Sequence, residues 1–210
     1  MRQTNASASM RERAPGSISI ASRLRQNEGF SLVEIGIGLM LACSLAGFAL
    51  INMGAVMPGI RANQSMYQTV SQLRQGRQLA IAQRREIQLR FIGNNRMSLV
   101  RNEFPEGEQV LSEVSLNKDC QFMKSDDIDM DTPDAFGPDE LSEMGAVDFG
   151  GAETLTFRSD GTLVDELGNP VNGTVFIGMA DHPEMARAVT ILGATGRIRS
   201  YRWTGEEWIQ

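Results

Sequence analysis

A run of 23 residues without a charged side chain, residues 35–57, constrains this 210-residue chain more than any other feature. As a helix, at about 1.5 Å per residue, the run would be roughly 34 Å long, which is enough to cross the hydrocarbon core of a bilayer. A surface helix of a soluble domain normally carries a polar stripe, whereas Ser44 and Asn52 are the only clearly polar members of this run. The sequence therefore predicts a transmembrane or assembly helix over residues 30–57.

Charge is distributed unevenly around this run. Residues 1–29 carry five arginines against two glutamates, and residues 58–101 carry eight arginines against Glu86 alone. Residues 102–184 hold twenty acids against three bases, which gives the whole chain its net charge of -6. Because arginines before a span favour the cytoplasmic side, we expect the N-terminus inside and the chain after residue 58 outside. A cleaved secretory signal peptide is the less favoured alternative, because the apolar run is too long and lacks a convincing cleavage site of small residues.

The junction before the run reads Gly29-Phe30-Ser31-Leu32-Val33-Glu34. It resembles the processing site of type IV prepilins and type II secretion pseudopilins. The resemblance implies that a prepilin peptidase/methyltransferase removes residues 1–29 as a leader, cutting between Gly29 and Phe30, and then N-methylates Phe30. The sequence departs from the pattern at Glu28, where a basic residue is usual, and in the length of its leader.

Glu34 needs a partner on physical grounds. A carboxylate at the apolar start of a membrane helix costs roughly 2.5–3.5 kcal/mol on insertion scales, and residues 35–57 contain no cation. The family resemblance implies that Glu34 pairs with the new amine of Phe30 on a neighbouring subunit during assembly. The alternative is an unpaired carboxylate that reaches the membrane interface. Gly38, Ala42 and Ala46, at four-residue spacing, would let another helix approach closely.

The remainder predicts a helix that continues over residues 58–85, with a kink or break at Pro58-Gly59, followed by a β-rich domain over residues 86–210. Residues 86–91 and 97–100 alternate in polarity around a Gly-Asn-Asn turn, which is typical of a hairpin. The apolar face expected along the helix comprises Ala62, Met66, Val70, Leu73, Ala80 and Ile81. Further strands are expected over residues 109–116, 120–123, 153–157, 162–164, 174–179, 188–192 and 197–203. The fold class is therefore α+β, with a long N-terminal helix on a mostly antiparallel sheet and an acidic insertion at about residues 125–147.

Three further segments, residues 76–85, 155–161 and 196–199, resemble the GspH/FimT group of minor pseudopilins. The resemblance implies a pilin-like fold and a structural subunit of the periplasmic pseudopilus of a type II secretion system. The implied location is the bacterial inner membrane, crossed once. The implied partners are the prepilin peptidase, other pseudopilins or pilins of the filament, and the inner-membrane assembly platform.

A second reading rests on Gly196-Arg197-Ile198-Arg199. On a strand, Arg197 and Arg199 share a side with Tyr201, and arginines beside aromatic rings can bind phosphates and stack on bases. With Arg202 they form the candidate DNA-binding residues of a FimT-like type IV pilus minor pilin that takes up DNA. Against this, the leader carries a net +3, so the mature chain carries -9, and an acidic surface repels DNA. The structural alternative is a strand face that neutralises part of the acidic middle.

Catalysis and metal binding are not expected. The chain has one histidine, His182, in a polar loop, and two cysteines, Cys43 and Cys120, that are not expected to pair. The aspartates of residues 125–147 lack the glycine and glutamate of a calcium loop, with Thr132 and Pro138 in those places. We therefore predict no cofactor and no metal ligands. An uncleaved single-pass membrane protein with an enzymatic outer domain is the third reading, which an intact N-terminus would favour.

Overall fold

The computed structural model describes residues 30–103, 105–125, 128, 131–136, 145–152 and 154–210. The side chains of residues 49–53 and 55 are also left aside. The chain divides into two compact units, Met1–Ala46 and Gly47–Gln210, which we describe separately. Within the part of the chain that the structure describes, no helical stretch combines the length and hydropathy needed for a transmembrane span.

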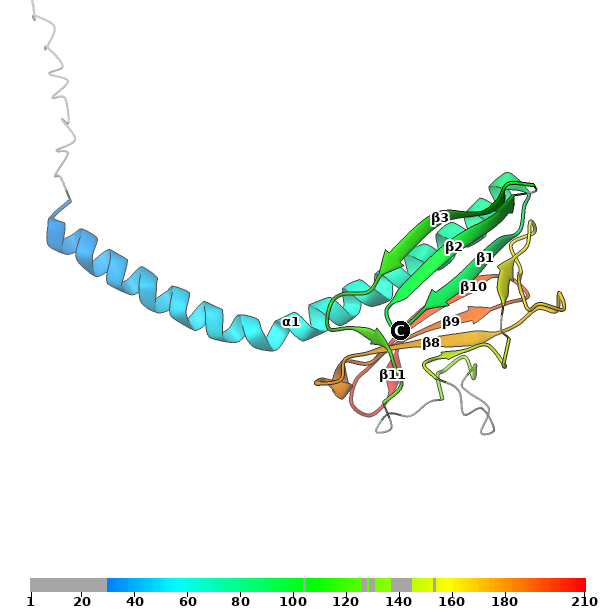
Figure 1. Cartoon of the computed structure of the whole chain (residues 1–210). Helices are drawn as coiled ribbons and strands as arrows, with labels where there is room; N and C mark the ends of the chain where they lie inside the picture. The colour runs from blue at the N-terminus through cyan, green and yellow to red at the C-terminus, as the bar shows by residue number, and fades with distance from the viewer. Residues whose placement is uncertain (1–29, 104, 126–127, 129–130, 137–144, 153) are drawn as a thin grey trace, which may run out of the picture. The chain divides into compact units, whose positions relative to one another are not determined.

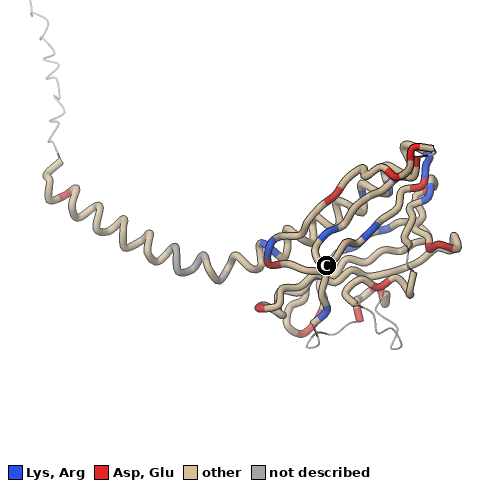
Figure 2. The backbone as a smooth tube through the Cα atoms, in the orientation of Figure 1, with Lys and Arg blue, Asp and Glu red and all other residues tan. Residues whose placement is uncertain are grey.

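Helix α1, Leu32–Gln83, supplies the described part of the first unit and continues into the second. It begins where the Ser31 hydroxyl accepts a hydrogen bond from the Val33 amide at 3.4 Å, as a capping side chain does. Figure 2 shows a single acidic segment near its start, at Glu34, and no further charge until the helix reaches the second unit. A kink or break was expected at Pro58-Gly59, and the helix is not broken there. Pro58 lies inside the helix, because a proline removes only one backbone donor and the turns on either side keep theirs.

The second unit contains two antiparallel sheets (Figure 1). In the first, the strand order is β3-β2-β1-β6-β7, and in the second it is β11-β10-β9-β8-β4, with the short β5 also paired to β8. The bounds in the first sheet are β1 Ile87–Ile92, β2 Arg96–Glu103, β3 Gly107–Ser115, β6 Leu155–Phe157 and β7 Leu163–Val164. Those in the second are β4 Gln121–Phe122, β5 Val147–Asp148, β8 Gly173–Gly178, β9 Arg187–Leu192, β10 Arg197–Trp203 and β11 Trp208–Ile209. A single-turn helix, Pro183–Met185, precedes β9. The predicted antiparallel β-rich domain is therefore confirmed.

The core of the second unit lies between the last turns of α1 and the sheets. Ala62, Met66, Val70, Leu73 and Ala80 are buried as the periodicity predicts. Ile81 was assigned to the same stripe, and this is wrong: it is 42% exposed, since it follows Ala80 directly and so turns by about 100° away from it. Gly76 sets the closeness of the packing, because a Cβ there would lie 2.8 Å from Leu99 Cδ2.

The turn between β9 and β10 is also tightly packed. Gly193 to Gly196 form the hairpin turn between these two strands, with the Gly196 amide donating to the Gly193 carbonyl at 3.3 Å. Gly196 has a φ of 62°, and a Cβ at this position would lie 2.3 Å from the Gly161 carbonyl oxygen. Arg77 Nε on α1 donates to that same oxygen at 3.2 Å. The glycine of the Gly-Arg-x-Arg motif is thus required where two turns and the helix meet.

Candidate functional site

Of the residues predicted to take part in processing and assembly, Phe30 and Glu34 lie at the start of α1, in the first unit. Gly29 falls outside the described residues, whereas Phe30, immediately before the helix, is 77% exposed. Glu34 lies in the first turn of α1, is exposed, and makes no ion pair with any residue that the structure describes. A carboxylate near a helix N-terminus is favoured by the helix dipole. Glu34 is therefore an exposed carboxylate without an ion-pair partner among the described residues.

The expected packing ridge follows Glu34 along the same helix. Gly38, Ala42 and Ala46 are exposed, and a Cβ added at Gly38 would meet no atom within 4 Å. The large apolar side chains around them are exposed as well, among them Ile35, Ile37, Leu39, Met40, Leu41, Leu45 and Phe48. Among the described residues, nothing covers these apolar side chains. An exposed apolar surface with small residues is typical of a helix that contacts another helix or lipid.

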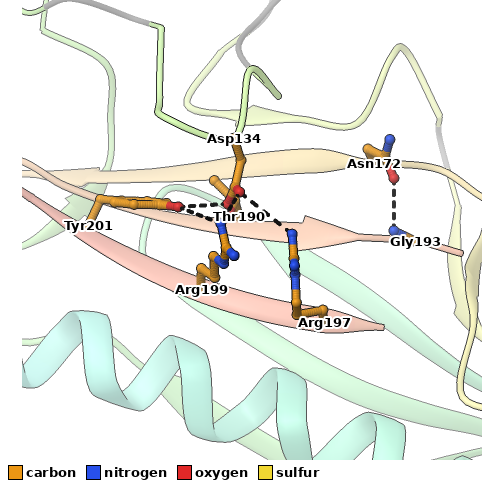
Figure 3. A network of polar contacts seen from close by, with 7 residues as sticks. All are labelled: Asp134, Asn172, Thr190, Gly193, Arg197, Arg199 and Tyr201. Atoms are coloured by element: carbon orange, nitrogen blue, oxygen red, sulfur yellow. Dashed lines mark hydrogen bonds and ion pairs between the residues drawn. The ribbon is translucent and has the colours of Figure 1, made fainter. Parts of the chain in front are cut away.

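The candidate DNA-binding arginines lie on β10, and two of them are joined to an aspartate. Figure 3 shows Arg197, Arg199 and Tyr201 turned toward Asp134, as the predicted alternation along the strand requires. Arg199 Nη1 donates to Asp134 Oδ1 at 2.6 Å, and Arg197 Nη2 lies 3.7 Å from the same oxygen. Thr190 Oγ1 and Tyr201 Oη donate to the other carboxylate oxygen, Oδ2, at 2.6 and 2.8 Å.

This network makes Asp134 the electrostatic centre of the face. Its side chain is only 6% exposed, whereas those of Arg197 and Arg199 are 50% and 35% exposed. Burial acts to raise the pKa of Asp134, but hydrogen bonds from Thr190 and Tyr201 and the charge of Arg199 outweigh it, so the pKa is lowered. For Tyr201, burial leads the causes that raise the pKa of the phenol. The aspartate is held as a carboxylate and compensates the charge of the arginines.

Arg202 does not join this cluster. In the pairing of β9 with β10, Arg202 stands opposite Arg187, while Arg199 stands opposite Thr190. Directly paired residues of antiparallel strands share a face, so Arg187 and Arg202 lie on the side away from Asp134. Arg187 is buried, with 3% of its surface exposed, and burial, with the nearby charge of Arg202 second, lowers the pKa of its guanidinium.

Sequence reasoning did not find Asp134 or Arg187. Asp134 is one of eight acids in residues 125–147, and nothing in the local pattern separates it from its neighbours. Arg187 is flanked by Ala186 and Ala188 on a strand whose other members are apolar or uncharged. A charged residue in such a strand is the only signal that could have drawn attention to it, since buried arginines are rare.

The remaining candidates give simple outcomes. Cys43 and Cys120 are both free, the former exposed and the latter buried, as expected for two cysteines that do not pair. Burial raises the pKa of the Cys120 thiol, which makes it a poor nucleophile. His182 is 41% exposed, and its Nδ1 lies 3.2 Å from Glu184 Oε1. Among the described residues no group of three or more histidine, cysteine or acidic side chains could hold a metal ion.

Comparison with known proteins gives structural likeness only. No family profile and no curated protein matches the sequence. The solved structures that match are minor subunits of type II secretion and type IV pilus systems. One is the minor pseudopilin EpsH of Vibrio cholerae, 16% identical, with a TM-score of 0.45 over 67% of this chain and 95% of that one. Another is the type IV minor pilin FimU of Pseudomonas aeruginosa, 17% identical, with a TM-score of 0.46 over 70% of this chain and 92% of that one. At this identity the likeness concerns the fold and not the function.

Proposed function

We propose that this chain is a minor pseudopilin of a type II protein secretion system, a structural subunit and not an enzyme. The observation that carries the proposal is the first half of α1. It is apolar and exposed, and it bears one carboxylate, Glu34, without a partner among the described residues. The Gly29-Phe30 junction directly before this helix supports the same conclusion.

In this proposal the leader of residues 1–29 stays in the cytoplasm until the prepilin peptidase cuts after Gly29. The cut creates an amine on Phe30, four residues before Glu34 and about one helical turn from it. Residues 30–57 anchor the subunit in the inner membrane, and the sheet unit lies in the periplasm. On assembly, Glu34 docks on the Phe30 amine of a neighbour, which removes two unpaired charges from an apolar environment. Gly38, Ala42 and Ala46 then allow close packing of adjacent helices.

The docking step is tested by replacing Glu34→Ala in a host that expresses the whole secretion machine. The variant should enter the membrane normally, because removing a charge lowers the insertion penalty. Its co-purification with partner pseudopilins should fall about tenfold or more, as expected when one buried charge pair is lost. Glu206→Ala, which removes an exposed carboxylate near the C-terminus, is the matched control. Normal co-assembly of Glu34→Ala would refute the docking role.

The processing step is tested by intact-mass analysis of the chain recovered from that host. The expected product begins at Phe30 and is heavier than residues 30–210 by one methyl group. Recovery of the chain with residues 1–29 attached would instead favour an uncleaved membrane protein, and the pseudopilin proposal would fail.

The alternative is a FimT-like minor pilin that binds DNA for uptake. Arg197 and Arg199 share a face with Tyr201, which favours it. The same contacts weigh against it, because both arginines already share the carboxylate of Asp134 and Arg202 lies on the opposite face. A phosphate would have to displace a nearly buried carboxylate. Secretion is therefore the better supported function.

A further inference from the structure

A groove of about 540 Å³ opens on the second unit beside the turn of α1 that contains Pro58 and Gly59. Its apolar side is formed by Val56 and Ile60 of α1, Met185 before β9, and Trp203 at the end of β10. Its polar side holds Arg187, Arg202 and Asn63. The lining of the groove is thus amphipathic, since it contains two guanidinium groups and four apolar side chains, which we call the apolar track.

Neither arginine has a carboxylate partner among the described residues. Arg187 Nε donates to Asn63 Oδ1 at 2.8 Å, and its Nη1 donates to the Ala186 carbonyl at 2.7 Å. These are neutral acceptors, and they use two of the five N–H groups that a guanidinium offers. Glu184, which also lines the groove, lies against His182 and not against either arginine. Arg202 is exposed and makes no ion pair with any described residue.

Such an arrangement is costly unless an anion completes it. Holding a buried guanidinium without a counter-charge is unfavourable, and placing a second cation beside it adds repulsion. Elsewhere in the same sheet, Arg197 and Arg199 share the carboxylate of Asp134 as an ion-pair partner. The chain has therefore left one arginine pair uncompensated, in a concave site with room for a ligand.

We propose that this groove binds the headgroup of an anionic phospholipid, with its phosphate between Arg187 and Arg202 and the start of an acyl chain along Val56, Ile60 and Met185. Two guanidinium groups can bind a phosphate through charge-assisted hydrogen bonds, and arginine suits this geometry better than lysine. The inference rests on the proposed membrane-anchored subunit. Residues 56–60 include the end of the uncharged run 35–57 and the three residues after it, so they would meet the outer headgroup layer. Trp203, which lines the groove, is of a residue type enriched at that depth.

An acidic surface of a neighbouring subunit is the rival occupant. It would satisfy the two arginines, but it would leave the apolar track beside them without a matching group. A phospholipid fills both parts of the groove with one molecule. The exposed apolar side chains Val56 and Ile60 support the lipid for the same reason.

The test uses the full, unprocessed chain in a non-ionic detergent, mixed with equal amounts of phosphatidylglycerol and phosphatidylcholine, and native mass spectrometry to count the bound lipids. We expect retention of phosphatidylglycerol over phosphatidylcholine, and a loss of about tenfold in that preference for Arg202→Gln, as expected when a charge-assisted hydrogen bond is removed. Arg187→Gln should behave in the same way. Arg74→Gln, which removes an exposed arginine from α1, is the matched control and should keep the preference.

Each other outcome overturns the proposal in a recognisable way. If Arg202→Gln, which is exposed and safe for folding, retains phosphatidylglycerol like the unchanged chain, the site is not where we place it. If inorganic phosphate displaces the lipid at equal concentration, the groove is a small-anion site. If lipid preference is absent and Arg202→Gln instead abolishes cross-linking to another subunit, the groove is a protein interface. A chain that is processed and assembles through Glu34, yet shows no lipid preference, loses this inference alone and keeps the proposed function.

Discussion

Two pairs of arginines lie on opposite faces of β9 and β10, and they differ in how their charge is compensated. Arg197 and Arg199 surround the carboxylate of Asp134, which reaches them across 65 residues of sequence in the case of Arg199. Among the described residues, Arg187 and Arg202 have only neutral acceptors or solvent. The pair that forms a visible motif shares one carboxylate, and the pair without a motif has no carboxylate partner among the described residues.

The difference teaches that a strand motif fixes which side chains share a face, but not what covers that face. Alternation along β10 is a local property, so it could be read from four consecutive residues. What lies against that face depends on a segment distant in sequence, here the one that carries Asp134. Its buried carboxylate binds the two arginines, so that they form an internal polar network and are less available to a phosphate. The charge available for a ligand can therefore lie on the side that the motif does not mark.

The largest expected effect concerns the glycine of the motif. Gly196→Ala places a Cβ 2.3 Å from the Gly161 carbonyl oxygen, at a φ of 62° that alanine rarely adopts. Backbone must move to relieve this contact, so we expect a loss of about 3 kcal/mol in the free energy of unfolding. Urea denaturation followed by far-UV circular dichroism measures it.

Gly168→Ala is the matched control for this variant. Gly168 also has a positive φ, 84°, but a Cβ there meets no atom within 4 Å. Only the backbone preference is lost, so a smaller loss of about 1 kcal/mol is expected. Equal losses for the two variants would mean that the close approach at Gly196 does not matter, and the motif would regain a purely functional interpretation.

The next effect concerns the compensated pair. Asp134→Asn removes the central charge while keeping the shape of the side chain. We expect a loss of about 1–2 kcal/mol at pH 7, which is less than for a fully buried pair because Arg197 and Arg199 can still reach water. Asp181→Asn, in an exposed loop, is the control for the same change of charge. No difference between the two variants would show that the network contributes nothing to stability.

The stabilisation by Asp134 should depend on pH, and the direction follows from its pKa. The pKa of Asp134 is lower in the folded chain than its ordinary value, which is about 3.9 in an unfolded peptide. Its contribution is therefore complete above the unfolded pKa and is lost as the pH falls through the folded pKa. The difference in unfolding free energy between the unchanged chain and Asp134→Asn should shrink below about pH 4. A difference that stays constant into the acid range would contradict the ionised carboxylate.

Much of the fold could be predicted because its signals are local. The stripe from Ala62 to Ala80 follows the helical period, and β1, β2, β8, β9 and β10 follow polarity or a continuous apolar run. The two-residue strands β5 and β11 were not predicted, and each pairs with the edge of a longer strand, β8 and β10 respectively. At Pro58, where a kink or break was expected, the helix continues on both sides, so no break occurs.

The candidate sites divide along the same line. Glu34 could be singled out from the sequence because it is the one carboxylate directly before a long uncharged run. The partners of Arg197 and Arg199 could not, since the choice of Asp134 among eight neighbouring acids is made by tertiary packing against Thr190 and Tyr201. Arg187 was missed because its lack of a counter-charge is a property of the folded unit and not of the strand.

The smallest expected effect is on DNA binding. It tests whether Arg197 and Arg199 serve only the network with Asp134, or whether they would bind a phosphate if Asp134 did not occupy them. The full chain in detergent is titrated with duplex DNA at two salt concentrations, beside Arg197→Ala/Arg199→Ala and Asp134→Asn. If the network is structural, the three proteins bind equally weakly, because an acidic chain has few free cations to release counter-ions from DNA. Salt-sensitive binding by the unchanged chain that the double variant loses would favour DNA uptake over secretion. Binding that appears only in Asp134→Asn would mean that the carboxylate occupies a usable phosphate site. Both arginine pairs would then be able to bind a phosphate, and they would differ only in whether a carboxylate of the chain already occupies them.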